Sequence, residues 1–291
     1  MACGVNSSCK KILGADGMHY RHPKYNGILL SMHTIDGDGC TMLVAIAIVP
    51  VESEQHWHWF FSLYRESGVT FEDKVLFVDR DKGSIAAALQ MANEGMQINM
   101  RWCTQHIVRN CINKFGISTN DAQFRAYVFG LQGAKSVSDH QNQLQLIASE
   151  YGSGVAEYLR SINPISWMQY ANTASIIEQM ENWCSLNQND STQVSTQDAA
   201  VVSTQSEMPV STQYETAEVC TQDSSSTHEV SMQDSSIRNV LVGIPMCMYG
   251  VRDTNFVEGQ NGLFAKKGFR DCLPYRSLRH YHDYMVNQAF E

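Results

Sequence analysis

The sequence of 291 residues predicts a mixed α/β domain into which a long helical segment is inserted. Two observations support this fold class. Short apolar runs of strand length open the chain, and segments with apolar residues at helical spacing then alternate with further short runs. The resulting order is β-β-β-α-β-α-β, a hairpin meander followed by α/β crossovers. We therefore expect a mixed sheet with helices packed on it.

Each element of this first part has its own signal. A short apolar run at 11–15 precedes Asp16. Strands at 27–34 and 41–49 are joined by the turn sequence Asp-Gly-Asp-Gly at 36–39. The second of these strands is apolar nearly throughout, which indicates burial on both faces. The other expected elements are a helix at 52–66, a strand at 74–78 that ends at Asp79, an alanine-rich helix at 83–93 and a strand at 99–103.

Composition divides the chain into four segments: 1–106 is the N-terminal part of the core, 107–186 is mainly helical, 187–236 is a polar tract, and 237–291 holds helices near 256–267 and 275–285. Half of the tract is Ser, Thr or Gln, and its eight acidic residues without any Lys or Arg supply −8 of the formal charge of −9. Such a composition predicts disorder. The remainder is nearly neutral, which argues neither for nor against a nucleic-acid partner.

The sequence predicts neither a membrane span nor a secretory signal. No apolar run approaches the length of a span, and the N-terminus lacks an apolar segment between charge and cleavage site. Nine scattered cysteines without a C-x-x-C pair favour reduced thiols. We therefore expect no membrane partner and a cytosolic or nuclear compartment.

Asp16 and Asp79 are candidate metal ligands because each follows a short apolar run. If the two strands are neighbours in one sheet, both side chains emerge into the same crevice. Converging carboxylates are what hard divalent cations such as Mg²⁺ require. The alternative is structural: Asp16-Gly17 would form a turn, and Asp79 would cap the following helix.

A third candidate carboxylate is Glu258, in the segment DTNFVEGQN at 253–261. Asn255 as N-cap with Glu258 three residues later would be an ordinary capping box, which is the structural alternative. Capping does not account for Asn261, one turn further on the same helical face. Lys266, Lys267 and Arg270 follow and could contact DNA phosphates, although a solvated basic helix face explains them equally well.

Cys103-x-x-His106 is half of a zinc-ligand pattern, and the sequence has no second half with matching spacing. Zinc is therefore not expected. A buried cysteine and a hydrogen-bonded histidine that support the end of a strand near the crevice explain the pair more simply.

Several of these motifs, in this order and spacing, resemble the transposase domain of Mutator-like elements (MULE), of the DDE/RNase H-like superfamily. They are Asp16-Gly-Met-His19 with Tyr25-Asn-Gly27, Val44 to Glu52, Trp57-His-Trp-Phe60, Asp79-Arg-Asp-Lys-Gly83, Cys103-x-x-His106 with Asn110, and DTNFVEGQN with FRDCLP behind it. The similarity is dense over 10–115 and returns at 250–276.

The resemblance implies an RNase H-like sheet that holds Asp16, Asp79 and Glu258 around two Mg²⁺ (or Mn²⁺) ions, with Asp16 bridging them and with Cys103, His106 and Asn261 in support. It implies metal-dependent cleavage and transfer of DNA strands, with double-stranded DNA (transposon ends and target) as partner and the nucleus as location. The helical insertion at 107–185 stands where the family has one. The sequence is also compatible with a homo-oligomer.

The chain also departs from the family pattern. Only 15 residues precede Asp16, where relatives usually carry a zinc-containing DNA-binding region, and the polar tract separates the insertion from Glu258. Two alternatives therefore stand beside the transposase. One is a catalytically inactive, domesticated relative that acts as a DNA- or protein-binding regulator. The other is an RNase H-like nuclease that cuts without strand transfer.

Overall fold

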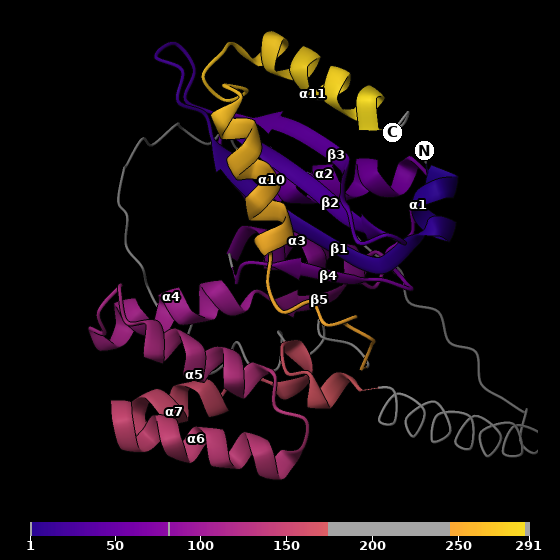
Figure 1. Ribbon diagram of the computed structural model, residues 1–291. Coiled ribbons are helices and arrows are strands. Elements are labelled where there is room, and N and C mark those ends of the chain that lie inside the picture. Colours follow the sequence, from indigo (N-terminus) through magenta and orange to yellow (C-terminus); the bar gives the residue numbers. More distant parts are fainter. Residues whose placement is uncertain (1, 81, 174–244, 289–291) are drawn as a thin grey trace, which may run out of the picture.

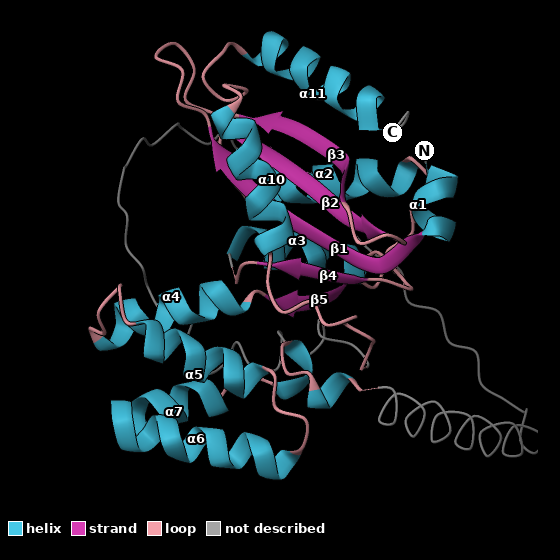
Figure 2. Cartoon of the chain, viewed as in Figure 1, coloured by secondary structure: helices cyan, strands magenta, loops and turns pink. Residues whose placement is uncertain are grey.

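A five-stranded mixed sheet forms the centre of the protein. The computed structural model describes residues 2–80, 82–173 and 245–288. The strands run in the order β3-β2-β1-β4-β5 (Figures 1 and 2). Antiparallel pairing joins β1 to β2 and β2 to β3, and parallel pairing joins β1 to β4 and β4 to β5. Their bounds are Cys9–His19 for β1, Ile28–Asp36 for β2, Thr41–Val49 for β3, Val75–Val78 for β4 and Asn99–Trp102 for β5.

This topology confirms the expected RNase H-like mixed sheet, with two local corrections. Asp16 lies within β1 and pairs with Ser31, so the strand continues past the short run at 11–15 and Asp16-Gly17 is not a turn. β3 is an edge strand in which Leu43, Ala47 and Val49 are buried and the other residues are partly exposed, so the expectation of burial on both faces is wrong. A hairpin partner on one side only leaves its outer edge and part of its surface to solvent.

One face of the sheet is covered by α2 (Glu54–Glu66) and α3 (Lys82–Asn93), which lie behind the sheet in Figure 1. Ser53 is the N-cap of α2, and its hydroxyl accepts the His56 backbone N–H. The aromatic residues of α2 recur at helical spacing and are buried, as the sequence predicted; they are Trp57, Phe60, Phe61 and Tyr64. They join the largest apolar core of the described residues.

The opposite face is covered by the C-terminal segment, through α10 (Asn255–Lys266) and α11 (Pro274–Gln288) (Figure 1). Phe264 of α10 packs edge-to-face against Tyr281 of α11, with ring centroids 4.8 Å apart. Gly14 of β1 makes the close approach of α10 possible, because a Cβ at this position would lie 2.5 Å from Val257 Cγ2. The sheet is thus enclosed between helices from two distant parts of the chain.

A mainly helical segment follows β5, as expected, and lies below the sheet in Figure 1. It consists of α4 (Thr104–Phe115), α5 (Ala122–Gln132), α6 (Val137–Tyr151), α7 (Ser153–Arg160) and two short 3₁₀ helices, η1 (Pro164–Ser166) and η2 (Tyr170–Asn172). A short helix not anticipated from the sequence, α1 (Ala2–Ser8), precedes β1. None of the helices in the described ranges is long and apolar enough to cross a membrane.

Hydrogen bonds join the two described segments that flank residues 174–244. Asn172 Oδ1 accepts a hydrogen bond from Nη2 of the buried Arg101, at 3.1 Å, and another from the Met246 backbone N–H, also at 3.1 Å. The end of the helical segment, β5 and the returning chain therefore meet at one amide. The polar tract at 187–236 lies outside the described residues.

Candidate active site

Asp16 lies in β1, and Asp79 directly follows β4, the neighbouring parallel strand. In the register of β1 and β4, Gly14 pairs with Phe77, and each aspartate lies two residues further along its strand direction. The two strands are therefore neighbours in one sheet, which is the condition under which we expected the two carboxylates to converge. Asp79 Oδ1 also accepts the backbone N–H of Arg80.

A buried relay of hydrogen bonds orients Asp16. Asn261 Nδ2 donates to Asp16 Oδ2 at 3.0 Å, and the Asn261 carbonyl oxygen accepts from Ser31 Oγ at 3.2 Å. Burial raises the pKa of the Asp16 carboxyl, although the Asn261 hydrogen bond and His106 act against this; the negative charge of Glu258 raises the pKa further. A cation beside Asp16 would relieve both burial and repulsion.

Glu258 lies in the first turn of α10 and faces β1 and α4. The N-cap of this helix is Thr254, not Asn255, so the structural alternative, a capping box of Asn255 and Glu258, is not formed. The Glu258 carboxylate instead interacts with a side chain: Thr254 Oγ1 lies 3.0 Å from Glu258 Oε1 and donates to it. Helix capping therefore does not account for Glu258.

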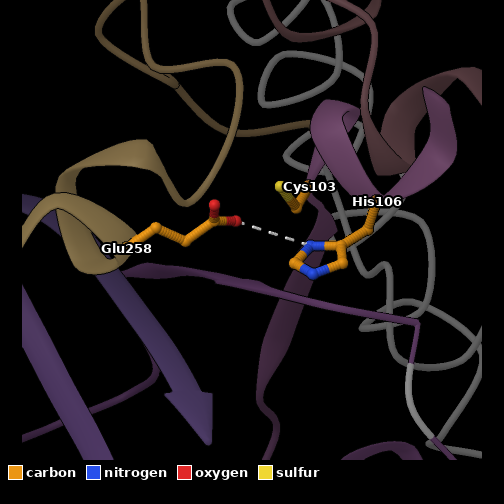
Figure 3. A group of neighbouring side chains, drawn as sticks. All are labelled: Cys103, His106 and Glu258. Carbon is orange, nitrogen blue, oxygen red and sulfur yellow. Dashed lines mark ion pairs between the residues drawn. The ribbon is translucent and has the colours of Figure 1, made fainter. Parts of the chain in front are cut away.

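The imidazole of His106 stands between two of the candidate carboxylates. Its Nε2 lies 3.5 Å from Asp79 Oδ2. Its Nδ1 lies 3.9 Å from Glu258 Oε1, the ion pair marked in Figure 3. The side chain is buried, and Nδ1 has no hydrogen-bond partner among the described residues. Asn261 contacts Asp16 from the same helix as Glu258, and His106 lies near both Glu258 and Asp79, so these contacts link all three predicted carboxylates.

Cys103 lies beside this group, directly after β5, and its side chain is fully buried. Its Sγ accepts the Thr254 backbone N–H at 3.3 Å and lies 3.1 Å from Thr254 Oγ1. Because the hydroxyl has one proton, it can donate either to Cys103 or to Glu258 at a given moment. Burial raises the pKa of the Cys103 thiol to about 11, despite these donors. Ligand atoms of Cys103, His106 and Glu258 all lie within 4.8 Å of one another.

The predicted DNA-contacting residues lie at the other end of α10. Lys266 and Lys267 are exposed, and Lys267 Nζ lies over the Tyr284 ring, 5.4 Å from its centroid. The Arg270 backbone carbonyl accepts the Arg21 N–H at 3.0 Å, which brings the exposed Arg21 to the same surface. This cluster of basic residues is compatible with both interpretations from the sequence, contact with DNA phosphates and a solvated basic face.

Sequence reasoning missed three polar residues of the site. Thr254 could have been found, since it lies four residues before Glu258 at helical spacing. Asp253 is a further buried carboxylate, and it accepts hydrogen bonds from the Asn255 backbone N–H and side-chain Nδ2 at 3.0 and 2.7 Å. Ser31 carries no local signal, because only strand pairing brings it opposite Asp16.

Residues 12–110 match the MULE transposase domain. The resemblance inferred from the motifs is thereby confirmed for this part of the chain. The matched span contains Asp16, Asp79, Cys103 and His106, and it ends before the helix that carries Glu258.

Among solved structures, the chain is similar to the HTLV-2 integrase catalytic core domain in complex with magnesium, in its trimeric and dimeric forms. Identity is 14% and 15%, the TM-score is 0.25 for both, and the alignments cover 43% of this chain and 86% and 87% of the integrase chains. No curated protein matches the chain.

Proposed function

We propose that the protein is the catalytic domain of a DDE-type transposase, which cuts and joins strands of double-stranded DNA by metal-dependent phosphoryl transfer. The observation that carries the proposal is the arrangement of three carboxylates. Asp16 and Asp79 occupy corresponding positions along adjacent parallel strands. Glu258 lies on α10, and Asn261 of the same helix donates a hydrogen bond to Asp16.

The donor set suits a hard divalent cation. Asp16, Asp79 and Glu258 offer carboxylate oxygens, which Mg²⁺ and Mn²⁺ prefer. The side chains of Asp79 and Glu258 are 41% and 32% exposed, so bound metal could retain water and reach a substrate. When bound, such cations activate a water or a DNA 3′-hydroxyl and stabilise the leaving oxygen.

The protein's own residues would act by positioning. Ser31 and Asn261 fix the orientation of Asp16, and His106 spaces Asp79 from Glu258. No covalent nucleophile is required, since the attacking oxygen comes from water or DNA, and preorganised charge supplies the rate enhancement. Lys266, Lys267 and Arg270 would hold the phosphate backbone on the surface next to α11.

The test is a strand-nicking and strand-joining assay on duplex DNA with Mg²⁺ or Mn²⁺. Wild type is compared with Asp79→Asn and Glu258→Gln, and with Glu150→Gln, which removes an exposed carboxylate from α6 and serves as the matched control. Loss of several kcal/mol of charge stabilisation predicts a fall on the order of 10³-fold for the first two variants and none for the control.

Three results would contradict the proposal. Unchanged cleavage by Asp79→Asn and Glu258→Gln would remove these residues from catalysis. Cleavage without joining would indicate a nuclease. DNA binding by a wild-type protein that neither cuts nor joins would indicate the non-catalytic regulator.

A further inference from the structure

A set of softer ligands lies against the three carboxylates. Cys103 Sγ, a ring nitrogen of His106 and a carboxylate oxygen of Glu258 lie within 4.8 Å of one another (Figure 3). The sequence offered only the first two and therefore argued against zinc. We propose that Cys103, His106 and Glu258 form a second, soft-metal site that binds Zn²⁺ and competes with the hard-metal arrangement for Glu258.

The distances suit a tetrahedral ion. Zinc binds at roughly 2.3 Å from sulfur and about 2.0–2.2 Å from nitrogen or oxygen, which places ligand atoms roughly 3.3–3.6 Å apart. The pair of His106 Nδ1 and Glu258 Oε1, at 3.9 Å, is already close to that separation. Small side-chain rotations would close the remaining gap, with water or a substrate oxygen as fourth ligand.

The histidine is oriented for this role. Its Nδ1 points toward Glu258 and has no hydrogen-bond partner among the described residues, although the side chain is only 7% exposed. Its Nε2 lies on the other side of the ring, 3.5 Å from Asp79 Oδ2. A zinc-ligating histidine usually donates its second N–H to a carboxylate, which fixes the tautomer. Asp79 is placed to be that carboxylate.

The cysteine sulfur is surrounded by donors. Cys103 is the N-cap of α4 and makes no side-chain capping bond, so its sulfur lies at the positive end of a helix dipole. The Thr254 backbone N–H adds a hydrogen bond at 3.3 Å. These groups would stabilise a metal-bound thiolate in a buried position. As the S–Zn bond forms, the thiol proton passes to solvent.

Binding of zinc at this site should affect strand cleavage, an inference that rests on the proposed function. Zinc would engage Glu258 directly and Asp79 through His106, and so take two of the three carboxylates from the Mg²⁺ arrangement. Zn²⁺ at low concentration should therefore inhibit Mg²⁺-dependent strand cleavage, and Cys103→Ser should relieve the inhibition while retaining the three carboxylates.

The experiment uses Co²⁺ as a spectroscopic probe, because thiolate coordination produces a near-ultraviolet charge-transfer band. The full chain, kept reduced, is titrated with Co²⁺ and then with Zn²⁺. We expect one equivalent of Co²⁺ to produce the band and Zn²⁺ to remove it. Cys103→Ser should abolish the band, and Cys111→Ser, which removes another buried cysteine from α4, should leave it unchanged.

Glu258→Gln should weaken Co²⁺ binding at least 10-fold without loss of folding, as judged by circular dichroism. Absence of the band in folded wild type, or its persistence in Cys103→Ser, would overturn the proposal. The titration needs no DNA and no turnover. A protein that shows the band but never cleaves DNA would therefore support the zinc site and count against the transposase activity.

Discussion

The two faces of the sheet are built from different parts of the chain. α2 and α3 cover one face and lie between the strands in sequence, so that residues 9–102 supply both the sheet and this layer. α10 and α11 cover the other face, after a detour through the helical segment and residues 174–244. The candidate site lies on this second face. Stability and site assembly should therefore respond to different substitutions.

The largest effect on stability is expected from the first face. Phe61→Ala removes a fully buried ring that contacts Trp57, Phe60 and Phe71. Truncation of such a residue leaves a cavity and costs about 3–5 kcal/mol of the free energy of unfolding. Chemical denaturation would measure this cost. Cleavage per folded molecule should remain near wild type, and a selective loss of activity would contradict the separation of the two faces.

Gly14→Val should act on the second face. The new side chain would enter the space of Phe256 and Val257, where even a Cβ lies 2.5 Å from Val257 Cγ2. Overpacking costs about 1–3 kcal/mol and shifts α10, so we expect a modest drop in stability with a disproportionate loss of cleavage.

Gly262→Ala is the matched control for this substitution, since it lies on α10 and an added Cβ there has no neighbour within 4 Å. Its helix propensity predicts a gain of up to about 1 kcal/mol and unchanged cleavage. Equal activity in Gly14→Val and Gly262→Ala would show that the position of α10 does not matter for the site.

Asn261→Ala should show what the orientation of Asp16 contributes, apart from the charge of the three carboxylates. It removes the hydrogen bond to Asp16 and leaves all three carboxylates in place. Loss of a partner that orients a metal ligand typically costs about 10–100-fold in metal affinity or activity. A Mg²⁺ titration of cleavage measures the shift, and Asn261→Asp would show whether an oxygen alone can replace the amide. A Mg²⁺ dependence identical to wild type would exclude Asn261 from the site.

The smallest effect is expected from shortening the connection between the two parts. Replacement of residues 187–236, the tract whose composition predicts disorder, by a short Gly/Ser linker should leave the melting temperature nearly unchanged. Asn172 and Met246 are already joined by a hydrogen bond, and loop length changes the closure free energy only by about 0.6 kcal/mol per doubling. Asn172→Ala, which leaves the buried guanidinium of Arg101 and the half-buried backbone N–H of Met246 without this acceptor, should cost more, about 1–3 kcal/mol. The opposite ranking in thermal unfolding would contradict this account.

Local patterns in the sequence were sufficient to place most helices and strands and to propose candidate site residues. Short apolar runs and helical spacing placed β2, α2 and β4, and the segment DTNFVEGQN marked the helix that carries Glu258. They were insufficient where an element depends on its neighbours. β3 has the composition of a fully buried strand and lies at an edge, because its exposure depends on how many strands pair beyond it.

Residue types and their local spacing were therefore determined by the sequence: two aspartates after apolar runs, a glutamate in a first helical turn, and a Cys-x-x-His pair. Their combination was decided by tertiary structure. The parallel register of β1 and β4 aligns Asp16 with Asp79, and α10 brings Asn261 to Asp16 across 245 positions. The same helix places Glu258 beside Cys103 and His106, so that half of a zinc pattern gains a third candidate ligand. Short-range spacing cannot show this, because a ligand set is a property of positions in space, and chain segments of any separation can supply it.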